Sequence, residues 1–309
     1  MPKNTDWSSN VNNLSSFTSQ RVKTSLLDIE YLEWNPGGAK TIVLTHGWPD
    51  APISWQAMAS TLAASGMRVL APTLRGFGGT RFLSPDTLRS GQLAALGRDM
   101  VEFVQALKLD RPILVGHDWG GRSVGNAVGL VPDIASHLVL MSIGYGTNHP
   151  DQPMTYDQTR RYWYHWFMAT PRGEHAVRTD GKQFAREMWE NWGPKGWFSE
   201  QDYQEVARAF DNPDWPDVVL HSYRHRWGFA ASDPIYDPEE NALYPAPVIT
   251  TPTLVIHGAE DYCNHPSVSV GKEHFFSGRY ERVLIDGVGH FPHRENPAAV
   301  LRAIQQFCA

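Results

Sequence analysis

The chain has 309 residues, of which 41% are hydrophobic and 19% charged, a balance that is ordinary for a globular enzyme. Its formal net charge of −6 provides no basic field that would favour binding to nucleic acid or to an anionic membrane. Only two cysteines occur, Cys263 and Cys308, so neither a disulfide framework nor a structural zinc site is indicated.

The first twenty or so residues are rich in asparagine and serine. They lack the apolar segment of a secretory signal, and the sequence contains no run of about 18 apolar residues that would span a membrane. We therefore expect a cytoplasmic protein.

Strands and helices are expected to alternate along most of the chain. Short apolar or alternating runs predict strands at 21–24, 29–34, 41–45, 68–71, 113–115, 137–141, 252–257 and 282–285. Helical patterns are found at 54–65, 91–107, 119–131 and 297–307. This order predicts an α/β fold with a doubly wound, mostly parallel sheet.

The alternation stops between about 144 and 245, where helical patterns and seven tryptophans occur but no clean buried strand. A helical insert after one strand is expected to form a cap over the carboxyl edge of the sheet, where such sheets bind ligands. We therefore expect a first core part at 1–143 (with a polar leader at 1–20), a helical cap at 144–246 and a second core part at 247–309.

The segment from Pro112 to Gly121 carries the clearest functional signal. A predicted strand runs without a loop into Gly-x-Asp-x-Gly-Gly and then into a predicted helix. Glycines on both sides of Asp118 relieve the crowding of so sharp a turn, because they have no Cβ. The pattern predicts a nucleophile elbow with a carboxylate in place of the usual serine. The alternative is an aspartate that only caps a helix.

Two further polar residues follow predicted strands. Asp261 comes after the strand at 252–257, and His290 comes after the last strand. The order nucleophile, acid, histidine is that of α/β-hydrolases, in which a carboxylate behind the histidine fixes its tautomer. Spacing along the chain leaves open whether the fold brings these residues together.

These patterns resemble the α/β-hydrolase fold family, in its epoxide hydrolase and haloalkane dehalogenase branch. The matching motifs are His46-Gly47-Trp48-Pro49, Arg75-Gly76-Phe77-Gly78, Gly116-His117-Asp118-Trp119-Gly120-Gly121, Gly258-x-x-Asp261 and Gly289-His290. They extend from about residue 20 to the C-terminus. The resemblance implies that Asp118 is the nucleophile, Asp261 the acid and His290 the base. It also implies an oxyanion hole made by the backbone N–H groups of Trp48 and Trp119.

Within this branch, the inserted helices determine the reaction. The segment that starts at Tyr164 resembles the part of epoxide hydrolases whose tyrosine points at the nucleophile, and the segment around Tyr223 resembles the part that carries its partner. The register is fixed to within one or two positions, and two core tyrosines are the alternative interpretation. Further residues that we expect to line the substrate pocket are His46, Pro49, His165 and Trp166.

Phenols suit an epoxide because its oxygen becomes a strongly basic alkoxide, which needs a neutral acid with a pKa of about 10. A halide needs only a weak donor, so Trp119 keeps a dehalogenase as the alternative. Haloalkane dehalogenases carry asparagine where Trp48 stands. Fluoroacetate dehalogenases carry arginine directly after the aspartate, where this chain has Trp119. Arg122 and the pair His165-Trp166 nevertheless resemble residues of that subgroup.

We therefore predict an epoxide hydrolase that acts on a small apolar epoxide and water, with no cofactor and no metal. A ligand receptor with the same fold is a second alternative. The oligomeric state is left open, with a homodimer as one option. The histidines His46, His117 and His293 show no metal-ligand spacing, and His293 is expected at the surface beside His290.

A second nucleophile motif, Gly-x-Ser-x-Gly, occurs around Ser123. No strand leads into it, and Ser123 would lie inside the helix that Asp118 opens. We therefore interpret the match as chance.

Overall fold

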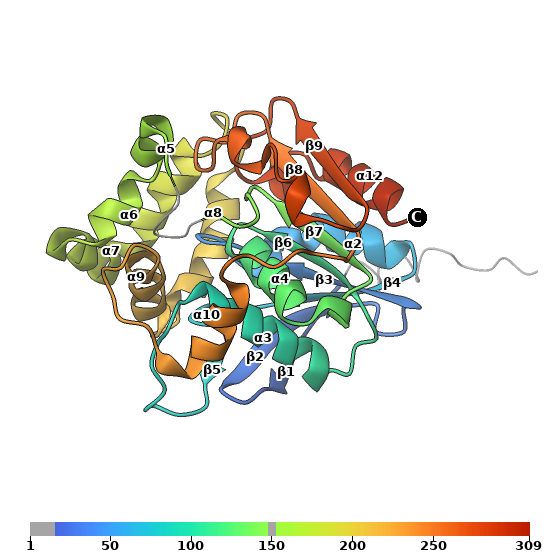
Figure 1. Ribbon diagram of the computed structural model, residues 1–309, viewed down its shortest axis with the longest axis horizontal. Coiled ribbons are helices and arrows are strands. Elements are labelled where there is room, and N and C mark those ends of the chain that lie inside the picture. The colour runs from blue at the N-terminus through green and yellow to red at the C-terminus, as the bar shows by residue number, and fades with distance from the viewer. Residues whose placement is uncertain (1–15, 148–152) are drawn as a thin grey trace, which may run out of the picture.

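The computed structural model of the protein describes residues 16–147 and 153–309, which fold around one large sheet (Figure 1). Its strands are β1 (Thr18–Lys23), β2 (Leu27–Trp34), β3 (Lys40–Thr45), β4 (Met67–Pro72), β5 (Arg81–Phe82), β6 (Ile113–His117), β7 (His137–Met141), β8 (Thr253–Gly258) and β9 (Tyr280–Ile285). They are ordered β1-β2-β4-β3-β6-β7-β8-β9, and β5 pairs with β2.

From β4 to β9 along this order the strands run parallel, whereas β2 is antiparallel to both β1 and β4. In the centre, Val43 of β3 lies opposite Leu114 of β6, which in turn lies opposite Leu138 of β7. The prediction of a mostly parallel, doubly wound sheet is confirmed.

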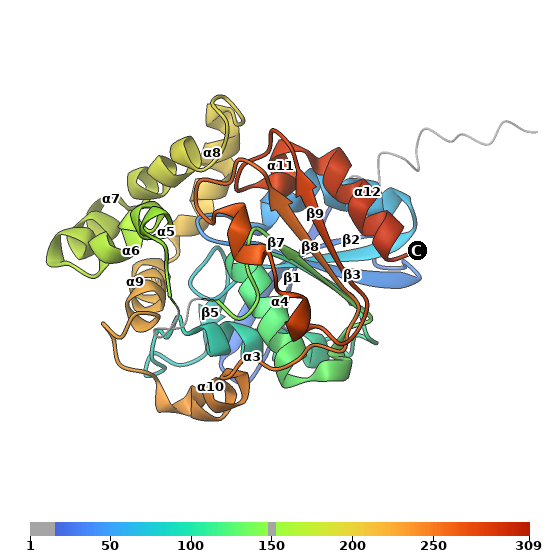
Figure 2. The ribbon, with the colours of Figure 1, turned by 45° about the horizontal axis from the view of Figure 1, so that its top comes forward.

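Helices cover both faces of the sheet (Figure 2). On one face lie α2 (Gln56–Ala64) and α12 (Pro297–Phe307), and on the other lie α3 (Leu93–Ala106) and α4 (Trp119–Leu130). Alternate residues of the strands enter two separate apolar cores, so that Ile42 packs with α2 while Val43 packs with α3 and α4. Strands buried on both faces read as continuous apolar runs, which is why the sequence revealed them.

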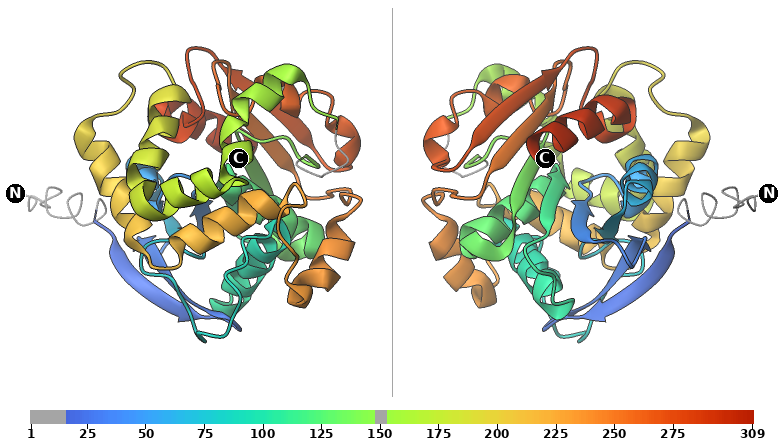
Figure 3. Two further views of the ribbon diagram at one scale, coloured as in Figure 1. Left: turned by 90° about the vertical axis from the view of Figure 1, so that its left-hand side faces the viewer. Right: turned by 90° about the vertical axis from the view of Figure 1, so that its right-hand side faces the viewer.

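The helices between β7 and β8 pack over one end of the sheet (Figures 1 and 3). They are α5 (Tyr156–Arg161), α6 (Trp163–Met168), α7 (Pro171–Asn191), α8 (Glu200–Ala207), α9 (Trp215–His225) and α10 (Asp237–Leu243). Short 3₁₀ turns connect elements at Pro52–Trp55, Pro132–Ile134, Arg208–Asp211, Pro234–Tyr236, Pro266–Ser269 and Glu273–Phe275, and the short helix α11 spans Pro292–Glu295. Within 16–147 and 153–309, no helix is both long and apolar enough to cross a bilayer.

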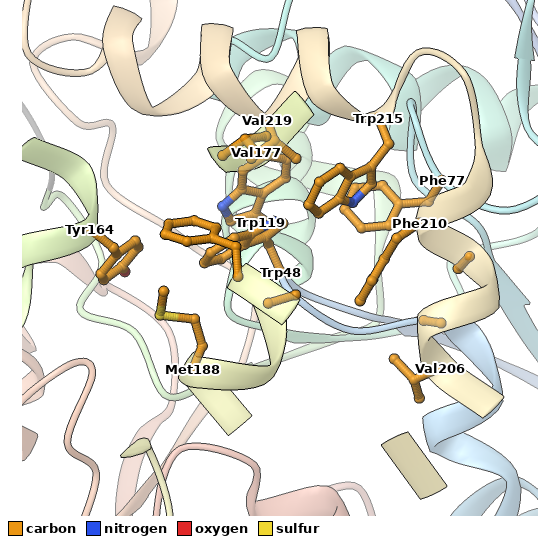
Figure 4. Close-up of a cluster of buried hydrophobic side chains, with 14 of the residues drawn as sticks. Trp48, Phe77, Trp119, Tyr164, Val177, Met188, Val206, Phe210, Trp215 and Val219 are labelled. Atoms are coloured by element: carbon orange, nitrogen blue, oxygen red, sulfur yellow. The ribbon is translucent and has the colours of Figure 1, made fainter. Parts of the chain in front are cut away.

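A third apolar core joins these inserted helices to the sheet. Figure 4 shows Trp48 and Trp119 at its centre, with Tyr164 to one side and Trp215 and Phe210 to the other. Many of the tryptophans therefore lie at one interface, between the inserted helices and the rest of the fold. The loop after β3 supplies Trp48, the start of α4 supplies Trp119, and the inserted helices supply the facing side chains.

The backbone segments around the turn from β6 into α4 are closely packed. Asp118 has φ 49° and ψ −115°, a conformation that non-glycine residues rarely adopt. A Cβ atom on Gly120 would lie 2.1 Å from the carbonyl oxygen of Thr45, and one on Gly116 would lie 2.2 Å from the carbonyl oxygen of Gly120. The two glycines therefore allow β3, β6 and α4 to approach one another closely enough to form this turn.

Ser123 lies inside α4, where its buried hydroxyl donates to the carbonyl of Leu96. No strand ends at this residue. The interpretation of its motif as a chance match is confirmed.

The close contact at Gly120 predicts a large loss of stability on substitution. We expect Gly120→Ala to lower the free energy of unfolding by about 1–3 kcal/mol or more, because a backbone oxygen cannot move away from the new methyl group. Gly37→Ala is the matched control, since a Cβ there meets nothing within 4 Å and the change should stay within about 0.5 kcal/mol. Urea denaturation of both variants measures the difference, and equal losses would contradict this account of the turn.

Candidate active site

The residues singled out in the sequence meet at the carboxyl edge of the sheet. Trp48 follows β3, Asp118 follows β6, Asp261 follows β8 and His290 follows β9. Parallel strands place their carboxyl ends along one edge, and ligands bind there in open α/β sheets.

The structure brings Asp118, His290 and Asp261 into one line of contacts. His290 Nδ1 lies 2.9 Å from Asp261 Oδ2, and His290 Nε2 lies 3.7 Å from Asp118 Oδ2. The first distance is a hydrogen bond, whereas the second is an ion-pair separation that leaves Nε2 without a hydrogen-bond partner in the described part of the chain. An imidazole that is oriented at Nδ1 by a carboxylate and has no hydrogen bond at Nε2 has the arrangement of a general base.

Both carboxylate oxygens of Asp261 have partners in the protein. Its Oδ1 accepts from the backbone N–H groups of Cys263, at 2.8 Å, and Asn264, at 2.9 Å. Its Oδ2 contacts His290 and lies 3.3 Å from His257 Nε2. Burial alone would raise the pKa of Asp261, but the His290 charge and these hydrogen bonds hold its pKa far below the usual value. It is therefore a fixed anion.

His290 is clamped through its backbone as well. Its N–H donates to the carbonyl of Trp192 on the inserted helices, and its carbonyl accepts from His117 Nε2 at 2.7 Å and from the Ser142 hydroxyl at 2.9 Å. Burial by itself would lower the pKa of His290, but Asp261 and Asp118 outweigh it and raise the pKa to about 10. The imidazole is therefore charged at neutral pH.

Asp118 is 8% exposed, and its Oδ1 accepts a hydrogen bond of 2.9 Å from the backbone N–H of Trp48. Burial raises its pKa, yet the contact with His290 and the Trp48 hydrogen bond lower it overall. Trp119 is the first residue of α4, so its backbone N–H belongs to the free N-terminal turn of that helix. Asp118 is therefore ionised and lies among donors.

Tyr164 and Tyr223 both reach this site from the inserted helices α6 and α9. Their ring centroids are 5.3 Å apart, and each ring packs on Trp48, with centroid distances of 5.6 Å for Tyr164 and 5.0 Å for Tyr223. The Tyr223 hydroxyl accepts from the Trp119 indole N–H at 3.1 Å, and the Tyr164 hydroxyl lies 3.4 Å from Cys263 Sγ. Burial raises the pKa of both phenols well above 10, so both are neutral acids.

The other expected pocket residues have different surroundings. His165 is buried 4.5 Å from the Tyr223 ring, and its Nδ1 accepts from the Trp227 indole. The Trp166 indole donates instead to the carbonyl of Thr159. His46 and Pro49 support the loop after β3. The His46 Nε2 accepts from the Leu74 backbone N–H, and the Pro49 carbonyl accepts from the Trp189 indole.

The expectation that His293 lies at the surface is wrong. It is fully buried behind His290, with its Nε2 3.1 Å from Asp50 Oδ2, because α11 turns inward beneath the loop after β3. Ligand atoms of Asp50, His117 and His293 lie within 4.8 Å of one another, a grouping that chain spacing could not reveal. Burial lowers the pKa of both histidines, to about 3 for His117. Both histidines are therefore neutral, whereas Asp50, whose pKa is lowered to about 2, is ionised.

The arginine of the Arg75-Gly76-Phe77-Gly78 motif ties the inserted helices to the core. Its guanidinium is buried and makes two contacts of 2.6 Å with Asp99, and it donates to the Tyr236 hydroxyl at 2.9 Å. A Cβ on Gly76 would lie 2.8 Å from the Val218 side chain of α9. The motif therefore positions α9, the helix that carries Tyr223.

Sequence reasoning missed several residues around the site. Cys263 touches the Tyr164 hydroxyl, His257 contacts Asp261, and Arg226 lies over the Tyr223 ring. None belongs to a motif. The spacing of Arg226 three residues after Tyr223, on one helical face, is the only signal that pointed to any of them.

Comparisons with known proteins agree with this fold. The family model for the alpha/beta hydrolase fold matches residues 40–297. A Klebsiella pneumoniae protein of known structure, provisionally assigned as an epoxide hydrolase, is 33% identical, with a TM-score of 0.89 over 96% of this chain and 98% of its own. Epoxide hydrolase A of Mycobacterium tuberculosis is 26% identical over 94% of this chain and 97% of its own length. Epoxide hydrolase A of Mycobacterium thermoresistibile, at 22% identity and a TM-score of 0.76 over 94% of this chain and 98% of its own, shares the fold.

The raised pKa of His290 predicts a pH-dependent part of the stability. The imidazolium is stabilised by folding at pH values below its ordinary pKa of 6.5, and this stabilisation is lost as the pH rises through about 10. The free energy of unfolding of the wild-type protein minus that of His290→Gln should therefore be largest near pH 6 and shrink toward pH 10. Urea denaturation across this range measures it, and a constant difference would mean that His290 is uncharged in the fold.

Proposed function

Because this chain belongs to the α/β hydrolase fold family, we propose that it is an epoxide hydrolase that opens an epoxide to a vicinal diol. The observation that carries the proposal is the meeting of three groups at Trp48. Its backbone N–H binds the Asp118 carboxylate, and its ring contacts both Tyr164 and Tyr223. A nucleophile and two neutral acids thus contact the same residue.

In the first step, Asp118 attacks the less hindered ring carbon. A new carbon–oxygen ester bond forms as the ring carbon–oxygen bond breaks, and the departing oxygen takes a proton from a phenol. The Tyr223 oxygen already accepts from the Trp119 indole, so its own proton is directed elsewhere and is available to the epoxide. Tyr164 donates to the second lone pair of the same oxygen.

In the second step, the ester is hydrolysed by water. Esterification removes the negative charge of Asp118, which is one of the two charges that raise the pKa of His290. The pKa of the imidazole then falls, so His290 loses its proton, and this proton restores the phenol that was used in the first step. The neutral imidazole can then take a proton from water.

The hydroxide attacks the Asp118 carbonyl, and the N–H groups of Trp48 and Trp119 bind the oxyanion, each worth about 10²–10³ in rate. The bond between the carbonyl carbon and the substrate oxygen then breaks, and this oxygen takes the proton from His290 to complete the diol. The acid proton left on Asp118 returns to His290, which restores the starting ion pair.

We propose that the inserted helices form a cap over the substrate and that the division at 144 and 246 marks its limits. The described side chains that face Asp118 from these helices are mainly aromatic. An apolar chamber favours an apolar substrate body that is oriented by few polar groups.

A dehalogenase is the competing function, and one contact argues against it. A halide would need the Trp119 indole as a donor, but this N–H is already given to the Tyr223 hydroxyl. For a receptor without turnover, the chain would have no need of a base with a free Nε2 facing an ionised carboxylate. The contacts therefore favour the epoxide.

The role of the phenols predicts the effect of removing them. We expect Tyr164→Phe and Tyr223→Phe each to lower kcat for styrene oxide, and the double variant to lower it by roughly 10²–10⁴, because general acid catalysis is lost. Tyr156→Phe is the matched control, since that side chain is 90% exposed and should leave kcat unchanged. Diol formation measured by chromatography decides, and a double variant as active as the control would exclude both phenols as acids.

The covalent route predicts where oxygen from the solvent appears. His290→Gln should form the ester but hydrolyse it slowly, so mass spectrometry of the intact protein should detect the added mass of the epoxide. In the wild-type protein, a single turnover in heavy-oxygen water should place the label in Asp118 rather than in the diol. Label that enters the diol directly in this first turnover would instead indicate attack by water on the epoxide.

A further inference from the structure

Arg226 is a buried cation beside the proposed acids. It caps the C-terminus of α9, is 5% exposed, and lies with its Cζ 4.6 Å from the centroid of the Tyr223 ring and 5.3 Å from that of Trp119. One terminal nitrogen donates to the Ser222 hydroxyl at 3.0 Å. The guanidinium is therefore held over the face of one of the two phenols.

The charge of Arg226 has no carboxylate partner in residues 16–147 and 153–309, and its Nε is buried there without a hydrogen-bond partner. The equally buried Arg75, by contrast, makes two contacts of 2.6 Å with Asp99. Burying a charge is costly unless it is paired, and an aromatic ring and a helix C-terminus offset only part of this cost. Departures from such rules are expected at functional sites, which indicates that this arginine has a role in the site.

The two phenols differ in the charges that surround them. Burial raises the pKa of Tyr164, and Cys263 adds to this rise. Burial also raises the pKa of Tyr223, and the charge of Asp118 adds to it, but the positive charge of Arg226 opposes the rise. Tyr223 is thus the phenol whose ionised form is stabilised by a neighbouring cation.

We propose that Arg226 is a positioning residue whose cation, over the Tyr223 ring, stabilises the negative charge that this phenol acquires when the epoxide opens. The proposal rests on the proposed function and makes Tyr223 the proton donor, with Tyr164 as a hydrogen-bonding partner of the same oxygen. As the ring carbon–oxygen bond breaks, the Tyr223 proton moves to the departing oxygen, and the negative charge moves to the phenol oxygen. A cation beside the ring lowers the energy of this state, and more so where water is excluded.

A double-mutant comparison tests whether Arg226 acts through Tyr223. We expect Arg226→Gln to lower kcat for styrene oxide by roughly 10-fold with little change in KM, because the cation acts on the transition state. The same fall should occur in the Tyr164→Phe background, whereas Arg226→Gln should have no further effect in the Tyr223→Phe background. Equal losses in both backgrounds would mean that Arg226 only supports the fold, and would overturn the proposal.

Further variants separate the charge of Arg226 from its packing. Arg226→Lys keeps the charge and should recover part of the lost rate, and a variant no more active than Arg226→Gln would contradict a role of the charge. Arg226→Met, whose side chain is unbranched and uncharged, replaces Arg226→Gln if the latter does not fold. Arg302→Gln is the matched control, because it removes the same charge from an exposed site on α12, away from the inserted helices (Figure 1). It should leave kcat unchanged.

A spectroscopic measurement keeps the test independent of turnover. With 3-fluorotyrosine in place of tyrosine, each phenol gives a fluorine NMR signal that moves when the phenol ionises, and the signal of Tyr223 is the one that is lost in Tyr223→Phe. The titration of this signal should move to higher pH in Arg226→Gln, while that of Tyr164 changes less. This result supports the stabilising effect of Arg226 even if no epoxide is hydrolysed, an outcome that would refute only the proposed function. An unchanged titration of Tyr223 would refute the role of Arg226.

Discussion

The sharp turn at Asp118 is the constraint on which the rest of the site depends. A residue at φ 49° directs its side chain out of the sheet only because Gly116 and Gly120 let three backbone segments touch. Strain of this kind costs about 1–3 kcal/mol and persists where the surroundings hold it in place. At Asp118, the hydrogen bond from the Trp48 backbone N–H to the carboxylate holds the side chain in place. The loop after β3 and the turn after β6 are thus fixed by one another.

The charges of the site follow from that position. Two carboxylates, those of Asp118 and Asp261, flank the single imidazole of His290, and each of them favours its charged form. Behind them the buried histidines His117 and His293 are neutral, because desolvation outweighs the effect of the nearby carboxylates. Asp118, His290 and Asp261 together therefore carry a net charge of −1. Asp261 is fixed by four contacts, whereas the carboxylate of Asp118 accepts one hydrogen bond, from Trp48, in the described part of the chain.

Local features of the sequence predicted the fold and the positions of Asp118, Asp261 and His290 at strand ends. Strand periodicity and a glycine-flanked turn depend only on residues that are adjacent in the chain. The burial of His293 could not be predicted in this way, since it depends on how α11 packs beneath a loop more than two hundred positions earlier in the chain. The contact between Cys263 and Tyr164 likewise joins a loop of the core to an inserted helix. Such contacts arise only when separate elements are assembled.

The aromatic enclosure imposes opposing demands on the phenols. Burial keeps Tyr164 and Tyr223 protonated, as a donor must be, but it also makes each of them a weaker acid. The indole N–H of Trp119 partly offsets this at Tyr223, because a donor aimed at the phenol oxygen stabilises the developing phenolate. The positive charge of Arg226 over the same ring acts in the same direction. In the ring opening that we propose, Tyr223 is therefore held between apolar surroundings, which keep its proton in place, and two neighbours that ease the departure of this proton.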